Sequence, residues 1–488
     1  MSLCDLTIHE LKDLMNKKEI SSTDILKSVE NRITAVEDRV CSFINLDFDT
    51  AYKKAAQIDK KSISREITGL LAGIPLAVKD NMCIEGTLTT CASKILKGFK
   101  PPYTATAVMK LQEQDAVIIG KTNMDEFAMG SSTENSSAKS TKNPWDLNRV
   151  PGGSSGGSAS AVSSGEVIAS LGSDTGGSIR QPASFCSVTG LKPTYGLVSR
   201  FGLIAFASSL DQIGPIARDA QDCALMLSAI SGFDYMDSTS TNQASVNYVA
   251  HLDKSLEGLK IGLPIEYFGE GIDNSVKKVI LDAAQIFKKL GAEVKEFSLK
   301  YTPYALPAYY LISSAEASSN LARYDGIRYG YIADKYTDLI DMYCKTRTEG
   351  FGMEVKRRIM LGTYALSSGY YDAYYKKAQQ VRTLIIEDFK NAFDEFDIIL
   401  SPTCPTTAFN IGEKSSDPLQ MYLSDVCTVP VNIAGLPALS IPCGFSSGLP
   451  VGLQIIGRHY GEAQILNAAH IFQLNTNYHK QKPSLIKE

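Results

Sequence analysis

The sequence has little histidine and no excess of positive charge. Only five histidines occur in 488 residues, and the 49 lysines and arginines are outnumbered by 53 acidic residues, for a formal net charge of −4. A chain without a basic excess is poorly suited to bind a nucleic-acid backbone by itself. If RNA takes part in its function, we therefore expect a partner protein to bind that RNA.

The sequence also lacks metal-binding, redox and membrane motifs. Its ten cysteines are scattered, and no two have the C-x-x-C spacing of zinc or dithiol motifs. The first residues lack a basic segment followed by an apolar one, and no window of about 18 apolar residues exists. These absences predict a protein of the reducing cytoplasm, with no metal and no membrane association.

Short apolar runs alternate with helical patterns along the chain. Apolar residues make up 44% of the sequence, enough for a substantial core. Alternation of this kind predicts an α/β fold with helices on both faces of a sheet, either as one large unit with an insertion or as two domains. The predicted strands are 71–79, 116–120, 167–171, 259–263, 398–400 and 453–456, and clear helical patterns cover 274–290 and 462–472.

Three regions differ from the rest. Residues 1–60 are predicted to be a helical region packed on the core, with Ser22 or Thr23 as the N-cap of its second helix. Residues 61–475 form the α/β domain, within which 301–395 are rich in tyrosine and mostly helical. Residues 476–488 contain a proline and several lysines and are expected to be mobile.

Two Gly-Gly-Ser turns, Gly152–Ser158 and Asp174–Arg180, are the most informative feature. Glycine lets consecutive amides bend toward one point, and a serine in such a turn can be a nucleophile or a proton relay. A flexible linker is the common alternative, but the apolar run from Val162 to Leu171 separates the turns. Neither turn has the spacing of a phosphate-binding loop, and Ser178 is not followed by the glycine of a nucleophile elbow.

A serine nucleophile needs a base, and the sequence leaves two choices. A histidine from elsewhere in the fold would give a Ser-His-Asp triad. The alternative is Lys79, which directly follows an apolar run starting at Leu71. Burial disfavours the ammonium form and lowers the pKa of a lysine, which makes it a base.

These residues together resemble the amidase signature family of Ser-Ser-Lys amide hydrolases. Lys79 and the two glycine turns carry the resemblance, which runs over roughly residues 5 to 475. It is closest to the branch of glutamine-hydrolysing subunits of tRNA-dependent amidotransferases. The segments that resemble this branch are Phe127–Gly130, Val355–Gly362 and Asp417–Tyr422.

The resemblance implies a fold and a mechanism. The fold would be a large, mixed, twisted β-sheet with helices on both faces, and the insertion 301–395 would form part of the substrate pocket. Ser178 would attack an amide carbon, and Ser154, after a cis Gly153–Ser154 peptide, would pass the proton to neutral Lys79. Water would then hydrolyse the acyl-Ser178 ester. The oxyanion hole would consist of backbone N–H groups of the run from Thr175 through Gly176 and Gly177 to Ser178.

The resemblance also implies a glutamine site. Arg358 would bind the α-carboxylate, Asp425 the α-ammonium group, and Tyr309 would add a hydroxyl contact. Met129 and Ser155 are further predicted substrate-binding residues. Taken alone, each of these side chains is as readily a surface charge or a core residue. Arg180 is a further candidate for substrate binding, although we interpret it as a structural ion-pair partner of Asp174 or another acid, and we interpret Trp145 as a core residue.

Three hypotheses about function follow. The leading one is a glutaminase that supplies ammonia to a larger partner subunit, which activates Glu-tRNA(Gln), or Asp-tRNA(Asn), with ATP and Mg and makes the tRNA contacts; a small third subunit would complete the complex. This chain itself would need no cofactor. A stand-alone amidase for a small or aryl amide is the alternative, and a non-catalytic scaffold is the third hypothesis, opposed by the intact Lys79, Ser154 and Ser178.

Overall fold

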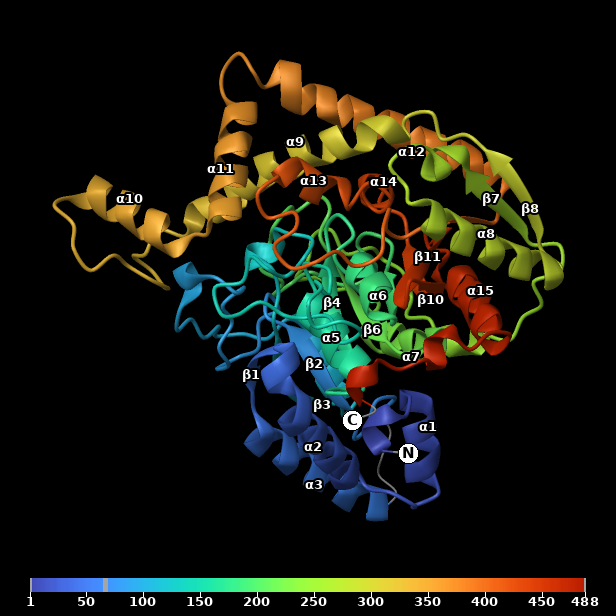
Figure 1. The fold of residues 1–488 in the computed structure, drawn as a ribbon. Helices are drawn as coiled ribbons and strands as arrows, with labels where there is room; N and C mark the ends of the chain where they lie inside the picture. Colours follow the sequence, from blue (N-terminus) through green and yellow to red (C-terminus); the bar gives the residue numbers. More distant parts are fainter. Residues whose placement is uncertain (1, 65–68, 487–488) are drawn as a thin grey trace.

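An eleven-stranded mixed sheet runs through the molecule (Figure 1). The computed structural model describes residues 2–64 and 69–486. β2 is parallel to both of its neighbours and so is β7, whereas the other pairs are antiparallel. In spatial order the strands are β1 (Phe43–Leu46), β3 (Val117–Thr122), β2 (Pro75–Lys79), β4 (Ala169–Asp174), β6 (Gln212–Ala217), β5 (Thr189–Lys192), β10 (Ala438–Ser446), β11 (Leu449–Gly457), β9 (Ile398–Pro402), β7 (Lys260–Pro264) and β8 (Glu293–Phe297).

The centre of the sheet is covered on both faces. Every residue of β2, β4, β5, β6, β9 and β11 is buried, and a strand whose two faces are both buried has elements packed above and below it. The predicted α/β fold with a mixed sheet is therefore confirmed. Each predicted strand overlaps a strand of the sheet, whereas β1, β5, β6, β8 and β10 were not predicted.

The N-terminal region is helical, with one short strand. It contains η1 (Leu3–Asp5), α1 (Ile8–Asn16), α2 (Ser22–Val40), β1 and α3 (Phe48–Ser64). The predicted N-cap of α2 is wrong by one residue. Ser21 is the cap, because its side chain accepts the N–H of Asp24 and the Asp24 side chain accepts the N–H of Ser21. Ser22 is the first helical residue, and its hydroxyl donates to the Gly73 carbonyl at 2.9 Å.

Helices connect the strands of the first two-thirds of the chain. α5 begins at Gly156, within the first Gly-Gly-Ser turn, and α6 begins at Arg180, the last residue of the second. Both turns therefore lie where the chain enters a helix beside the sheet. The helices are η2 (Lys94–Leu96), α4 (Thr106–Glu113), η3 (Glu126–Ala128), α5 (Gly156–Ser164), α6 (Arg180–Cys186), α7 (Ala220–Ile230), η4 (Tyr248–His251), η5 (Ile265–Phe268) and α8 (Asn274–Lys289).

The tyrosine-rich segment 301–395 is mostly helical, as predicted. In Figure 1 it lies above the sheet, where α9 packs against α11 and α12. Its elements are η6 (Thr302–Tyr304), α9 (Ala305–Asn320), η7 (Leu321–Arg323), α10 (Leu339–Gly350), α11 (Met353–Leu366), the π-helical η8 (Asp372–Lys376) and α12 (Lys377–Glu395). The chain then continues through β9, α13 (Pro418–Leu423), α14 (Val429–Ile433), β10, β11, α15 (Glu462–Leu474), η9 (Tyr478–Lys480) and η10 (Ser484–Ile486).

Two sequence interpretations need correction. The tail expected to be mobile packs on the body: the buried Leu485 packs with Val36 and Val40 of α2, and Lys482 lies 3.3 Å from Asp5. Residues 487–488 lie outside the described residues. Trp145 is half-buried rather than in the core, with its ring against Phe445 at a centroid distance of 5.1 Å.

All ten cysteines are free. Within residues 2–64 and 69–486, every helix is too short or too polar to span a bilayer.

Candidate active site

Lys79 is the last residue of β2 and has no exposed surface. Its Nζ lies 2.7 Å from Ser154 Oγ and 2.9 Å from Ser173 Oγ. Burial lowers the pKa of Lys79 to about 7, although the nearby carboxyls of Asp125 and Asp174 oppose the shift. A lysine with such a pKa is about half neutral at its pKa and largely neutral one unit above it, so Lys79 can accept a proton from the hydroxyl beside it.

The first glycine turn places Ser154 beside Lys79. The Gly153–Ser154 peptide is cis, as the resemblance implied. The Gly153 N–H donates to Gln181 Oε1 at 2.7 Å, and the Ser154 carbonyl accepts the N–H of Asp125 at 3.2 Å. A Cβ at Gly153 would lie 2.1 Å from Asp125 Oδ2, so only glycine fits at this position.

The second glycine turn presents Ser178. The two turns are joined by a hydrogen bond from the Ser155 N–H to the Ser178 carbonyl, 3.1 Å long. Ser178 is 8% exposed, whereas Lys79 and Ser154 are 0% exposed. Ser178 is therefore the residue of these three that a substrate can reach, and Ser154 lies deeper, against the lysine.

The predicted oxyanion hole needs one correction. The Gly177 N–H already donates to Asp174 Oδ1 at 2.9 Å, so it is not free to bind an oxyanion. Within the described part of the chain, the N–H groups of Thr175, Gly176 and Ser178 donate to no other group of the protein. These three amides remain the candidates. The prediction for Gly177 is wrong because a fixed carboxylate lies directly under the turn.

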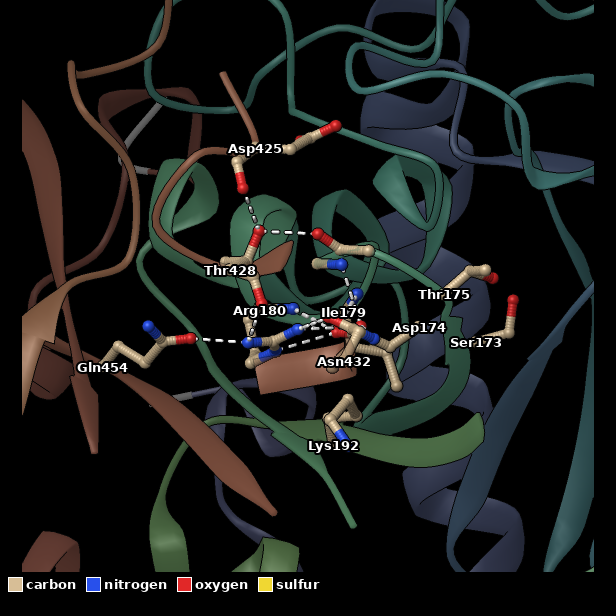
Figure 2. A network of polar contacts seen from close by, with 12 residues as sticks. Ser173, Asp174, Thr175, Ile179, Arg180, Lys192, Asp425, Thr428, Asn432 and Gln454 are labelled. Carbon is tan, nitrogen blue, oxygen red and sulfur yellow. Dashed lines mark hydrogen bonds and ion pairs between the residues drawn. The ribbon is translucent and has the colours of Figure 1, made fainter. Parts of the chain in front are cut away.

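That carboxylate belongs to a buried network under the turn (Figure 2). Arg180 donates to both oxygens of Asp174, each at 3.0 Å, which confirms the predicted ion pair. Arg180 also donates to Gln454 Oε1 at 2.6 Å and to the side chain of Asn432. Burial alone would raise the pKa of Asp174, but the Arg180 guanidinium holds that pKa well below its ordinary value.

The two charged residues predicted to bind the substrate, Arg358 and Asp425, both contact Tyr310. Arg358, on α11, is buried with its Cζ 5.0 Å from the ring centroid of Tyr310, and Glu354 Oε1 accepts from its Nε at 2.8 Å. Asp425 Oδ2 accepts from Ser131 Oγ at 2.7 Å and from the Tyr310 hydroxyl at 3.4 Å. Burial raises the pKa of Asp425 to about 7.

The remaining predicted substrate residues have different surroundings. Tyr309 packs on the nucleophile turn, because a Cβ at Gly176 would lie 2.6 Å from its hydroxyl oxygen. Met129 is fully buried in the segment that leads to Ser131. The Ser155 hydroxyl donates to the Ser173 carbonyl at 3.1 Å and its N–H donates to the Ser178 carbonyl, so both of its donors serve the turns, and its role in substrate binding stays a prediction.

Several residues of the site were not predicted from the sequence. Ser173 was signalled only by its place before Asp174, and Tyr310 only by its place after Tyr309. Ser131 directly follows Gly130, and Glu354 lies just before the basic run Lys356–Arg358, so each had a weak local signal, whereas Thr428 lies in a segment without a glycine or charge pattern. The residues concerned are Ser131, Ser173, Tyr310, Glu354 and Thr428.

Possible metal ligands gather at one other place among the described residues. Atoms of His9, Asp219 and Asp222 lie within 4.8 Å of one another. Asp222 Oδ2 accepts the Ile8 N–H at 2.7 Å, and Asp222 Oδ1 lies 2.9 Å from His9 Nδ1. These bonds attach α1 to α7, so we interpret the cluster as an anchor for the N-terminal helix.

Comparison with known proteins agrees with this geometry. A family model described as Amidase matches residues 24–466. The A-subunit of glutamyl-tRNA(Gln) amidotransferase from Thermoanaerobacter pseudethanolicus is 59% identical over 486 residues, covering 100% of this chain and 99% of the relative. The protein of the same name from Heliobacterium modesticaldum is 60% identical over 485 residues, covering 99% of this chain and 100% of the relative.

Solved structures are also similar over the whole chain. The crystal structure of the corresponding glutamyl-tRNA(Gln) amidotransferase subunit from Thermotoga maritima superposes with a TM-score of 0.82 at 42% identity, covering 98% of this chain and 96% of the other. A bacterial aryl acylamidase of the amidase signature enzymes superposes with a TM-score of 0.85 at 25% identity, covering 97% of each chain. The fold alone therefore does not distinguish the amide that is cleaved.

Proposed function

The chain belongs to the amidase signature family, and on that premise we propose that it is the glutamine-hydrolysing subunit of a tRNA-dependent amidotransferase. The observation that carries this proposal is the buried pair of opposite charges, Arg358 and Asp425, which share Tyr310 beside the nucleophile turn. Glutamine carries an α-carboxylate and an α-ammonium group, and this pair complements both. The relatives that share the chain's full length support the same assignment.

The geometry gives a route for the chemistry. Ser178 Oγ attacks the carboxamide carbon while Ser154 takes its proton and passes its own to Lys79, 2.7 Å away. The oxyanion is bound by the candidate amides of Thr175, Gly176 and Ser178, and one such donor is worth about 2.7–4 kcal/mol in the transition state. Lys79 returns the proton through Ser154 to the leaving nitrogen. Ammonia leaves, and water hydrolyses the acyl-Ser178 ester to glutamate.

The opposing alternative is a stand-alone amidase for a small or aryl amide. The serines and the lysine would serve such a substrate equally well, and an aryl acylamidase shares the fold. Arg358 already pairs with Glu354, but an apolar amide would leave the buried Asp425 without a cationic partner on the substrate. Buried charges need such partners, so the glutamine assignment accounts for the site better.

We propose that partners consume the ammonia. A larger subunit would activate the aminoacyl-tRNA with ATP and Mg and bind most of the tRNA, and a small third subunit would join the two. The net charge of −4 on this chain supports leaving the tRNA to a partner. This chain would need no cofactor for the hydrolysis, and the ten free cysteines favour a cytoplasmic location.

A tagged copy purified from its own cells tests the proposal. We expect two further proteins to co-purify and glutamine hydrolysis to be stimulated by tRNA. Arg358→Ala in this assembly should raise the KM for glutamine about 10- to 100-fold, because a buried charged hydrogen bond contributes about 1.5–3 kcal/mol. Steady-state ammonia release measures both effects.

Arg357→Ala is the matched control, because this neighbour on α11 is more exposed and also pairs with Glu354. Its KM for glutamine should stay within about twofold of the unmodified protein, as expected for an exposed ion pair. Three results together would identify a stand-alone amidase. The protein would purify alone, its Arg358→Ala variant would keep its KM for glutamine, and simple amides would be hydrolysed well.

The pH dependence of hydrolysis tests the role of Lys79. Its pKa is lowered to about 7 by burial, and only the neutral amine accepts a proton. Below this pKa the lysine is protonated and inactive, so kcat should rise with pH and level off above about 8, with a single apparent pKa near 7. A kcat that is constant from about pH 5.5 to about pH 9 would contradict Lys79 as the base.

A further inference from the structure

Thr428 links the predicted ammonium-binding residue to the nucleophile turn (Figure 2). It lies between Asp425 and α14, is 0% exposed, and its N–H donates to the Asp425 carbonyl at 3.0 Å. Its Oγ1 donates to the Gly176 carbonyl at 2.6 Å and lies 3.1 Å from the Asp425 carbonyl oxygen. One hydroxyl therefore connects a recognition segment to a turn that is far away in the sequence.

The bond from Thr428 fixes one peptide plane of the turn. The Gly176 carbonyl accepts from Thr428, and the N–H of the same peptide, on Gly177, donates to Asp174 Oδ1 at 2.9 Å. Because a peptide is planar, holding both ends sets its orientation. The candidate oxyanion donors on Gly176 and Ser178 belong to the two adjoining peptides. The directions of these two N–H groups therefore depend on the orientation of the Gly176–Gly177 peptide.

Packing makes the connection tight. A Cβ at Gly177, where φ is +134°, would lie 2.2 Å from Thr428 Oγ1, so the turn rests directly on the threonine. The Thr428 carbonyl in turn accepts from Arg180 Nη1 at 3.2 Å. The segment from Asp425 to Thr428 is thus attached to the turn at two points. A small displacement at Asp425 will be transmitted rather than absorbed.

We propose that Thr428 is a positioning residue that couples binding of the substrate's α-ammonium group at Asp425 to the alignment of the oxyanion amides. The inference rests on the proposed function, since it assumes that glutamine is the substrate. An ammonium held by Asp425 places the segment 425–428, and the Thr428 hydroxyl then holds the Gly176–Gly177 peptide in the productive orientation. A substrate without an α-ammonium group loses its contact with Asp425 and also the alignment of the oxyanion amides.

Thr428→Val and Thr428→Ser separate the hydroxyl from the packing. The assays compare glutamine with glutaramate, which has the same carboxamide and carboxylate but no α-amino group, on the purified assembly. Thr428→Val should lower kcat for glutamine by about tenfold or more with KM within about threefold, because a positioned donor acts mainly in the transition state. Thr428→Ser keeps the hydroxyl and should stay within about threefold of the unmodified kcat.

The coupling itself is read from the substrate preference. The ratio of kcat/KM for glutamine to kcat/KM for glutaramate should fall about fivefold or more in Thr428→Val. Without the hydroxyl, binding of the α-ammonium group at Asp425 no longer affects the alignment of the oxyanion amides. Thr141→Val is the matched control, because Thr141 is also 0% exposed and donates to a carbonyl, that of Cys41, at 2.6 Å. It should leave kcat and the preference unchanged.

Two results would overturn the inference: an unchanged preference in Thr428→Val, or a serine variant as impaired as the valine variant. Thermal unfolding is measured for each variant, and Thr428→Ala replaces Thr428→Val if the valine variant shows no cooperative transition. Failure of the proposed function appears separately, as an unmodified protein that hydrolyses glutaramate or simple amides as well as glutamine.

Discussion

Ser178→Ala will abolish glutamine hydrolysis, with kcat lowered at least about 10³-fold, since loss of a serine nucleophile costs up to about 10⁶ in related chemistry. Ser178 is the more accessible member of the serine pair, at 8% exposure, and Ser154 is fully buried against Lys79, so Ser154 cannot take over the attack. Binding of glutamine should persist, because Arg358 and Asp425 remain, so calorimetry should show a Kd within about threefold of the unmodified protein.

Ser184→Ala serves as the control for this variant. Ser184 is a buried serine on α6, the helix that follows the nucleophile turn, and its side chain packs against Gly452 of β11. Its replacement should leave kcat within about twofold, since it removes a hydroxyl from the same helix without touching the turn. Unchanged glutamine hydrolysis in Ser178→Ala would exclude Ser178 as the nucleophile and would move the search to another hydroxyl.

The central residues of the site were predictable only in combination. A serine in a Gly-Gly turn could belong to a linker, and its base could have been a histidine, but Lys79 and the two turns together match the amidase signature pattern. The structure then brings Lys79 and Ser154 within 2.7 Å. The parallel pairing of β2 with β4 places Lys79 Nζ 2.9 Å from Ser173 Oγ on β4, and Ser154 reaches Lys79 from the turn before α5. No sequence spacing contains this information.

The sequence did not predict which backbone N–H groups of the nucleophile turn are already hydrogen-bonded and which are free to bind the oxyanion. Whether the Gly177 N–H is free depends on Asp174, whose position depends on Arg180, which in turn is held by Gln454 on β11. Thr428 and Tyr310 likewise reach the site from segments that are distant in sequence. Tertiary contacts of this kind leave no local pattern in the chain.

The missed strands have local physical reasons. β6 contains Gly214 and Pro215, which are typical of turns, yet it lies in the middle of the sheet between β4 and β5. β8 is an edge strand whose residues are largely exposed, so it lacks an apolar run. The tail has a mobile composition, but Leu485 finds an apolar site on α2. In β6 and in the tail, burial available elsewhere in the fold outweighed local propensity.

Asp174→Asn will give the largest loss of stability among the site variants. The carboxylate is fully buried and binds the Arg180 guanidinium through both oxygens, while also accepting the N–H groups of Gly177 and Ile179. Removing its charge leaves a buried guanidinium without a counter-ion, which costs about 3–5 kcal/mol. In a chain of 488 residues this corresponds to a Tm lower by about 3–5 °C. Differential scanning calorimetry measures the shift.

The pH dependence of that loss identifies the ion pair as its cause. The pKa of Asp174 in the folded protein lies well below its ordinary value because of Arg180. The stabilisation is therefore complete above the unfolded pKa of about 3.9 and is lost as the pH falls toward the folded pKa. The Tm difference between Asp174→Asn and the unmodified protein should be constant from about pH 5 to about pH 8 and narrow below about pH 4.

Asp372→Asn is the comparison, because it removes the same charge from an exposed ion pair with Lys376. An exposed pair contributes little to stability, so its Tm should be unchanged. Equal Tm values for Asp174→Asn and Asp372→Asn would mean that the buried ion pair does not hold the nucleophile turn. A lowered Tm for Asp174→Asn with full catalytic activity would mean instead that Thr428 and Tyr309 are sufficient to orient the turn, and that Asp174 acts only on stability.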